Sequence, residues 1–291
     1  MLSCEAYTIL KKNVLDQTTD EAASWVEQIV TKLSVCPNSK ELCLGLAKAP
    51  KLIRRDAKFL LMEEDRHKLQ AIHKGWQSRH WSLLEATRIL FNLSVIHGSG
   101  DEDTIFLQAY KITELSEQIA FLKGLPLYGN SDFALTYAKD AVRSNIQSIF
   151  AAVSQFNTYP AINFSENEWN NMILKAVTWN YPLFEIYGID DRVNPSLMKM
   201  LCEYAREQDG AKRPTSIDLW RCVGPLSDDN ALFSLAEMLN STDIKKQYAA
   251  VLALHACSRV EARNLLDTKS DLVARVKKLD INWDTLNSKT I

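Results

Sequence analysis

Apolar residues recur every three or four positions along most of this chain, for example in residues 81–96, 132–156 and 166–179. Such steps place side chains on one face of an α-helix, whereas a half-buried strand needs strict alternation. Alternating runs are few, and glycine and proline number only 9 and 8, which argues against a turn-rich β architecture. The sequence therefore predicts an all-α fold.

Local start and stop signals divide the chain into about a dozen helices. Ser165 and Glu168 have the spacing of a capping box, and Asn194-Pro195 has the pattern of a helix start. We expect helices over residues 4–15, 19–34, 63–74, 81–96, 102–122, 132–156, 166–179, 230–240, 244–257 and 258–267, and a further helix that opens at 194–195. Residues 48–62 are expected to form a surface loop.

These helices favour an irregular α-solenoid, which is an array of helical hairpins. The pair 230–240 and 244–257 resembles a HEAT-type hairpin, because the run AAVLALHAC is rich in small residues that permit close packing. No strict repeat period covers the chain. The best candidate for a boundary between two parts of the chain lies near residues 124–131. We therefore expect an N-terminal helical region, 1–125, and a core with a HEAT-like end, 126–291, joined as one continuous domain.

Composition excludes several classes of function. Hydrophobic residues make up 46% and charged residues 24% of the chain, as in soluble globular proteins. The net charge of −2 creates no overall positive potential that would attract nucleic acid. The basic stretch around Arg54-Arg55 is predicted to be a solvated loop. No apolar run reaches the roughly 18 residues of a transmembrane segment, and the N-terminus lacks the pattern of a secretory signal. We expect a cytoplasmic location or an organelle stroma.

No signature of a common hydrolase, nucleotide-binding or metal site occurs in the sequence. The six cysteines form no CxxC pair. His67, His73 and His80 are predicted to lie on a solvated surface, and His255 to be packed in the core. The sequence thus predicts no metal and no cofactor, and it favours a protein that is not an enzyme.

Residues 143–221 stand out because polar side chains alternate there with strongly apolar helix faces. Two interpretations stay open. In the first, these groups brace the fold, with Asn194 as a helix cap and the arginines bound to loop groups. In the second, they surround a polar cleft for an anionic or hydroxylated small molecule. The candidate lining residues are Arg143, Asn145, Asn170, Lys175, Arg192 and Asn194, with Arg213 and Trp220 at the rim.

Five ordered elements in and around this region form a recognisable series. They are RSNIQSIFAAV from Arg143, NTYPA from Asn157, WNNMILKA from Trp169, GIDDRVNPSL from Gly188, and a final series made of Tyr204-Ala-Arg206, Arg213-Pro and Leu219-Trp-Arg221. The first four are similar to the R-x-N-I-x-x-V-F-E-A, N-P-Y-P-A, W-N-Q-M-V-L-K-A and G-L-x-x-R-x-N-P-E-L elements of EboA-domain proteins. The chain resembles this family strongly over 130–225 and weakly as far as residue 267.

The chain departs from the family pattern at two positions. Ala151 and Ser196 stand where the family elements have glutamate. A chemical role for either glutamate would be absent here, which favours a structural or binding role for these elements.

The resemblance implies a helical protein encoded in a gene cluster. Its neighbours there resemble a UbiA-type prenyltransferase, a sugar-phosphate cyclase and a TatD-like hydrolase, and the cluster is linked to the traffic of secondary-metabolite precursors. The implied partners are proteins of this cluster or a small metabolite.

Three hypotheses about function follow. The first is a non-catalytic binding or adaptor factor in the processing or trafficking of secondary-metabolite precursors. The second is an enzyme acting on a phosphorylated or cyclitol-like metabolite, with Lys175 and either Asp190 or Asp191 as the acid–base groups. The third is a pure protein-interaction solenoid with an exposed apolar groove.

Overall fold

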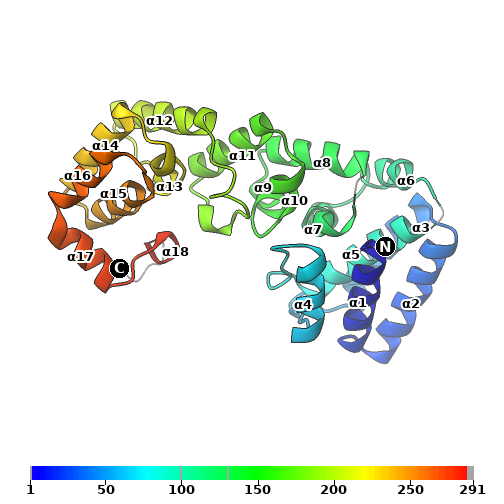
Figure 1. Ribbon diagram of the computed structural model, residues 1–291. Helices are drawn as coiled ribbons and strands as arrows, with labels where there is room; N and C mark the ends of the chain where they lie inside the picture. The colour runs from blue at the N-terminus through cyan, green and yellow to red at the C-terminus, as the bar shows by residue number, and fades with distance from the viewer. Residues whose placement is uncertain (1, 99, 130, 287–291) are drawn as a thin grey trace. The chain divides into compact units, whose positions relative to one another are not determined.

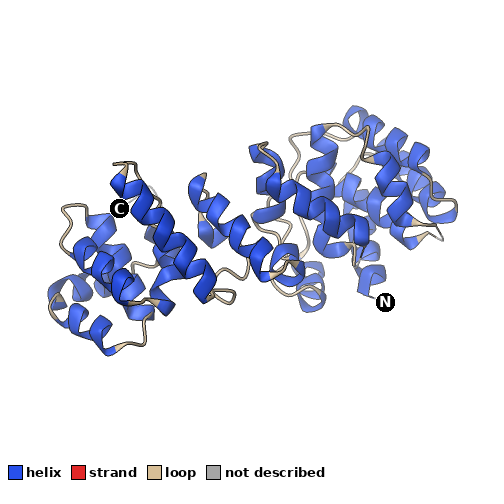
Figure 2. Cartoon of the chain, turned by 90° about the horizontal axis from the view of Figure 1, so that it is seen from above, coloured by secondary structure: helices blue, strands red, loops and turns tan. Residues whose placement is uncertain are grey.

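The structure, a computed structural model, describes residues 2–98, 100–129 and 131–286. Within these ranges the chain forms eighteen α-helices, three short 3-10 helices and no β-strand, apart from one isolated bridge between Lys58 and Ser82 (Figure 2). The predicted all-α fold is confirmed. The helices group into two compact units, Met1–Asn163 and Phe164–Ile291.

The unit Met1–Asn163, coloured blue to green in Figure 1, is built around one central helix. Its elements are α1 (Leu2–Asp16), α2 (Asp20–Val35), α3 (Ser39–Leu52), α4 (Glu63–Ile72), α5 (Leu83–His97), α6 (Glu102–Ala109), α7 (Leu115–Gly124), η1 (Leu125–Leu127), α8 (Asp132–Arg143), α9 (Gln147–Ser154) and α10 (Tyr159–Asn163). Helix α5 packs against α1, α2, α3 and α7.

Helix α5 is buried on all sides, and every residue from Ala86 to Val95 is buried. A helix that is apolar around its whole circumference belongs in a core. Its polar residues have partners: the Thr87 hydroxyl donates a hydrogen bond to a carbonyl one turn earlier, and the Asn92 amide bonds to the hydroxyls of Tyr110 and Tyr128. The start of α5 is fixed by a capping box.

Helix α15 takes the central place in the unit Phe164–Ile291. The elements of this unit are α11 (Glu166–Thr178), η2 (Leu183–Glu185), α12 (Pro195–Gly210), α13 (Leu219–Val223), η3 (Gly224–Leu226), α14 (Asp229–Leu239), α15 (Ile244–Ala256), α16 (Val260–Asp267), α17 (Ser270–Lys278) and α18 (Trp283–Leu286). Helix α15 packs against α13, η3, α14, α16, α17 and α18. Its small residues Ala249, Ala250 and Ala253 are fully buried, which permits this close approach.

Gly224 marks the tightest of these contacts. A Cβ atom added there would lie 2.6 Å from the carbonyl oxygen and 2.8 Å from the Cα of Ala253. Both are backbone atoms of α15, so neither can move aside as a flexible side chain would.

We expect Gly224→Ala to lower the free energy of unfolding by about 1–3 kcal/mol, the usual effect of overpacking. Thermal denaturation followed by circular dichroism measures the change. Gly210→Ala is the matched control, because nothing lies within 4 Å of its added Cβ, and alanine restricts the unfolded chain. Equal stability of the Gly224→Ala and Gly210→Ala proteins would contradict the close-contact explanation.

Three predicted helix boundaries are wrong. Residues 102–122 form two helices, α6 and α7, and residues 132–156 form α8 and α9. The second break lies at Ser144 and Ile146, which have extended backbones, and the Ser144 hydroxyl accepts a hydrogen bond from the Ile146 N–H. Apolar spacing continues across both breaks, so periodicity does not reveal them.

The third error concerns the predicted loop 48–62. Its first residues belong to α3, which starts where the Asn38 side chain accepts a hydrogen bond from the Glu41 N–H and which keeps Pro50 in its last turn.

His255 is also placed wrongly by the sequence pattern. It is exposed rather than packed, because the helical phase of α15 buries Ala253 and Leu254 and turns the next residue outward.

Candidate functional site

The eight predicted lining residues belong to both units. Arg143 and Asn145 lie in the unit Met1–Asn163, at the end of α8 and just beyond it, and both are exposed. The Arg143 guanidinium lies 3.4 Å from the Asp140 carboxylate, one helical turn away. The other six residues belong to the unit Phe164–Ile291, where three of them meet.

Asn170 and Asn194 form a reciprocal amide pair. Asn170 Nδ2 donates to Asn194 Oδ1 at 3.1 Å, and Asn194 Nδ2 donates to Asn170 Oδ1 at 2.8 Å. Asn194 Oδ1 also accepts the Leu197 N–H at 2.9 Å, which caps α12. Asn170 is 1% exposed, so its amide depends on this partner for its hydrogen bonds. The pair fixes the start of α12 to the buried face of α11.

Arg192 joins the same cluster from the loop before α12. Its guanidinium carbon lies 4.8 Å from the centre of the Trp169 ring, a cation–π contact, and Nη2 donates to the Phe164 carbonyl at 3.0 Å. Burial lowers the pKa of Arg192, and the charge of Glu166 opposes that shift. Arg192 thus ties its loop to both ends of the Phe164–Trp169 segment.

Lys175, Arg213 and Trp220 complete the predicted set. Lys175 Nζ lies 4.5 Å from the centre of the Trp179 ring, and burial lowers the pKa of this lysine. Arg213 is exposed in the segment after α12, and Trp220 is 8% exposed on α13.

A second polar cluster centres on Arg221, which the prediction left out of the lining set. Its Nε and Nη2 atoms each donate to one carboxylate oxygen of Asp190 at 2.7 Å, and Nη1 lies 3.4 Å from Asp284 of α18. Both oxygens of the Asp190 carboxylate are thus bound by Arg221, which joins the loop before α12 to α13.

Asn170, Arg192 and Asn194 therefore brace the unit Phe164–Ile291, and the predicted cap at Asn194 is confirmed. The role of the eight residues in lining a ligand cleft stays a prediction.

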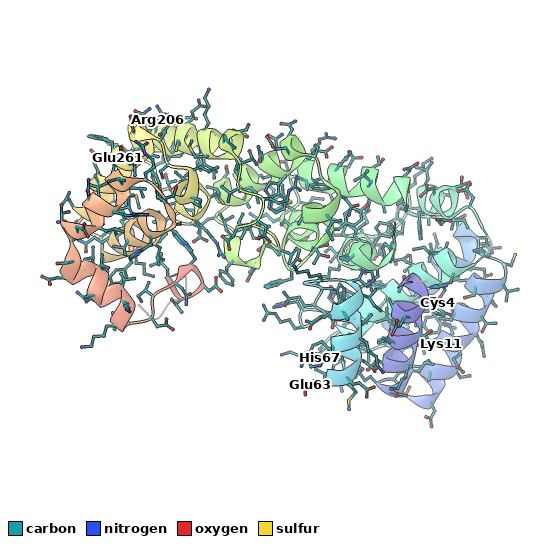
Figure 3. All side chains as sticks on the ribbon, viewed as in Figure 1. Cys4, Lys11, Glu63, His67, Arg206 and Glu261 are labelled. Carbon is teal, nitrogen blue, oxygen red and sulfur yellow. The ribbon has the colours of Figure 1, made fainter. Side chains whose placement is uncertain are left out.

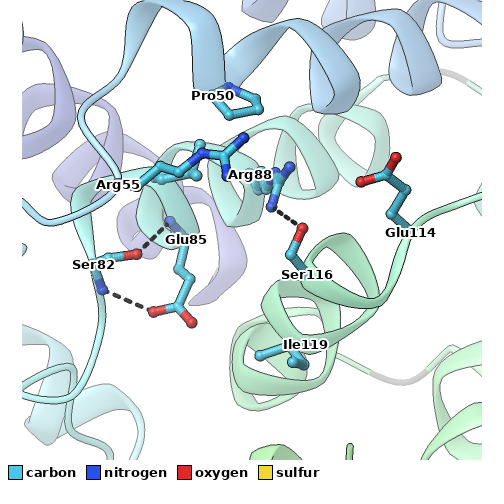
Figure 4. A pocket seen from close by; sticks show the side chains of 9 residues that line it. Pro50, Arg55, Ser82, Glu85, Arg88, Glu114, Ser116 and Ile119 are labelled. Carbon is cyan, nitrogen blue, oxygen red and sulfur yellow. Dashed lines mark hydrogen bonds between the residues drawn. The ribbon is translucent and has the colours of Figure 1, made fainter. Parts of the chain in front are cut away.

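A pocket of about 270 Å³ lies in the unit Met1–Asn163, between the end of α3, α5 and the start of α7 (Figure 4). It is lined by Pro50, Arg55, Ser82, Leu84, Glu85, Arg88, Glu114, Ser116 and Ile119. Sites for drug-sized ligands usually occupy roughly 300–1,000 Å³. The pocket is thus slightly smaller than the usual range.

One lining residue, Arg88, belongs to a buried ion pair. Arg88 Nη2 lies 3.5 Å from Glu117 Oε1, and the two side chains are 3% and 6% exposed. Arg88 also donates to the Ser116 hydroxyl at 3.0 Å and to the Leu46 carbonyl. Burial lowers the pKa of Arg88, and the charge of Glu117 opposes the shift. These bonds hold the guanidinium in one place, as Figure 4 shows for its contact with Ser116.

Glu85 is also fixed by its neighbours. One oxygen accepts the backbone N–H of Ser82 at 2.8 Å, and the other accepts Lys123 Nζ at 2.7 Å. The N-terminal capping box of α5 thus supplies part of the pocket wall.

Sequence reasoning missed this pocket because its lining comes from three separate segments. One usable signal was present, since Arg88 interrupts the apolar pattern of residues 81–96, and a charged residue there needs a buried partner. Arg55 is exposed, as predicted for a solvated loop, but it also borders the pocket.

The three histidines between residues 67 and 80 differ in exposure. His67 and His80 are exposed as predicted, and Figure 3 labels His67 beside Glu63 on α4. His73 is half-buried, and burial lowers its pKa. The residues described by the structure contain no group of three or more His, Cys, Asp or Glu side chains placed to hold a metal ion. No helix within that part of the chain has the length and hydropathy needed to cross a membrane.

Fold and pocket together define an all-α protein with a small pocket of charged and apolar side chains set among its helices. Residues 6–224 match the family described as metabolite traffic protein EboA, and the chain belongs to this family. Searches of curated proteins and of solved structures found no match. The matched residues include every residue that lines the pocket and the Asn170–Asn194 pair.

Proposed function

We propose that this chain is a non-catalytic binding factor in the metabolite traffic for which its family is named. The pocket among α3, α5 and α7 carries the proposal, because it combines a small volume with polar groups that are held in place. Such preorganised groups favour binding, since little ordering remains to be done when a ligand arrives.

The state of the pocket's charged groups supports binding rather than a reaction. Arg88 is bound to Glu117, and both oxygens of Glu85 are engaged by Ser82 and Lys123. A general acid or base must release and accept protons. Groups fixed in ion pairs are poorly suited to that task and well suited to orienting a molecule.

The proposal also includes the finer architecture expected from the sequence. Helices α14 and α15 pack together and are joined by the short segment 240–243, and α15 and α16 also pack together. Short connections between packed helices are typical of helical hairpins. We propose that this part of the chain is the HEAT-like end of an irregular α-solenoid and offers a surface to partner proteins.

Native mass spectrometry of the full chain, purified from its own source, tests the binding function. We expect a mass excess over the denatured chain that corresponds to a small molecule. Ile119→Trp fills the pocket and is expected to abolish this excess. Ile112→Trp is the matched control, because Ile112 is 75% exposed and does not line the pocket.

Two results would overturn the proposal. One is a bare polypeptide, or a chain that retains only a second protein, which would favour an adaptor. The other is a mass excess that survives Ile119→Trp unchanged.

A further inference from the structure

The charged groups of the pocket fall into two sets. Arg88 and Glu85 are neutralised by partners just outside the pocket, Glu117 and Lys123, at 3.5 and 2.7 Å. Because these charges are paired, they offer a ligand fixed hydrogen-bonding groups but little net attraction.

The second set consists of Arg55 and Glu114, both exposed at the rim. Within the described residues neither has an ion-pair partner among the salt bridges of the protein. The Glu114 side chain also accepts the Glu117 N–H in the capping box that opens α7. Arg55 lies in the loop after α3, and Glu114 directly precedes α7. In Figure 4 they extend from opposite sides, with Arg88 between them. Their charges act on Arg88 in opposite directions, Arg55 lowering and Glu114 raising its pKa, while burial is the main cause of its lowered value.

We propose that the pocket binds a small zwitterion, whose anionic group pairs with Arg55 and whose ammonium group pairs with Glu114. This inference rests on the proposed binding function. Each unpaired charge at the rim selects an opposite charge on the ligand, and charge-assisted hydrogen bonds are the strong ones.

The electrical balance of the site favours a zwitterion over a simple anion. The groups in and beside the pocket comprise three basic residues, Arg55, Arg88 and Lys123, and three acidic residues, Glu85, Glu114 and Glu117. A neutral site with separated charges complements a neutral ligand with separated charges. A simple anion would satisfy Arg55 but would be repelled by Glu114.

The apolar lining restricts the body of such a ligand. Pro50, Leu84 and Ile119 contribute carbon surface to the pocket. A short hydrocarbon body between the two charged ends fits this surface and the volume of about 270 Å³. The ligand class is therefore a small amino acid or a related amine that carries one carboxylate.

Isothermal titration calorimetry of the full chain with a series of ω-amino acids of increasing length tests the inference. The probes are β-alanine, 4-aminobutanoate and 6-aminohexanoate. Each is compared with the carboxylate and the alkylamine of equal chain length. We expect one zwitterion to bind about two- to fivefold more tightly than either singly charged analogue, since an ion pair at an exposed site makes a modest contribution.

Variants that each remove one charge then show which pocket residue binds which end of the ligand. Arg55→Gln should remove the preference for the carboxylate, and Glu114→Gln the preference for the ammonium. Arg54→Gln and Glu63→Gln are matched exposed controls that do not line the pocket, and both should bind as the unaltered chain does. Thermal denaturation of each variant checks that the fold is retained.

The outcomes separate this inference from the proposed function. Equal binding of a zwitterion and its carboxylate analogue, or binding unchanged by Glu114→Gln, overturns the zwitterion class while a co-purified molecule still supports a binding factor. Absence of binding by all of the ω-amino acids also overturns the zwitterion class. A native chain without any bound small molecule overturns the binding function itself.

Discussion

Glu117→Ala is expected to lower the free energy of unfolding by about 3–5 kcal/mol, the usual effect of breaking a buried ion pair. The change leaves the Arg88 guanidinium, 3% exposed, without its counter-charge. Arginine keeps its proton at any ordinary pH, so it cannot escape this penalty by becoming neutral. Glu117 also accepts the Glu114 N–H at 2.9 Å, and that bond is lost as well. Urea denaturation followed by circular dichroism measures the effect.

A double variant tests the cause of that loss. Arg88→Met combined with Glu117→Leu replaces both charges by apolar side chains, and it should recover most of the stability because no buried charge is left unpaired. Glu64→Gln is the control, since Glu64 pairs with Lys68 at an exposed surface, and no measurable change is expected. A Glu117→Ala protein as stable as the Glu64→Gln protein would refute the explanation.

Asn194→Ala is expected to lower the free energy of unfolding by about 2–4 kcal/mol. The lost helix cap accounts for about 1 kcal/mol. The remainder comes from the Asn170 amide, which is 1% exposed and loses its partner, a change that costs about 1–3 kcal/mol. Differential scanning calorimetry measures the total.

Two companion variants separate these contributions. Asn194→Ser retains an oxygen that can cap α12 but loses the amide pair, so its stability should fall between that of the native chain and that of Asn194→Ala. Asn171→Ala lies on the same helix as Asn170 but is exposed and bonds only to Asn167, one turn away, so little change is expected. If Asn194→Ser were no more stable than Asn194→Ala, the cap would make no contribution.

The helices with clear local signals are those the sequence predicts best. Ser165 and Glu168 predict the start of α11, and Pro195 the start of α12, because capping depends on neighbours in the chain. The break after Arg143 is not predictable in this way. Apolar residues continue at helical spacing across it, and only the backbone at Ser144 and Ile146 reveals it.

The contrast between local signals and packing also applies to the Asn170–Asn194 pair and to the pocket. The meeting of Asn170 with Asn194 was foreseeable in part, since each lies in a recognisable motif, but their reciprocal bonding depends on how α11 packs on α12. The pocket depends entirely on packing. Arg55, Arg88 and Glu114 come from segments that no local pattern joins.

Gly224 has a consequence for how this chain can be shortened. The match to the family ends at this residue, yet the backbone of Gly224 touches that of Ala253 in α15. The neighbouring residues Leu219 and Val223 are fully buried, and their helix packs against α15. A truncation at the limit of homology would cut through a folded core and expose apolar surface. Residues 225–286 are thus an integral part of this fold, and an expression boundary is better chosen from packing than from family similarity.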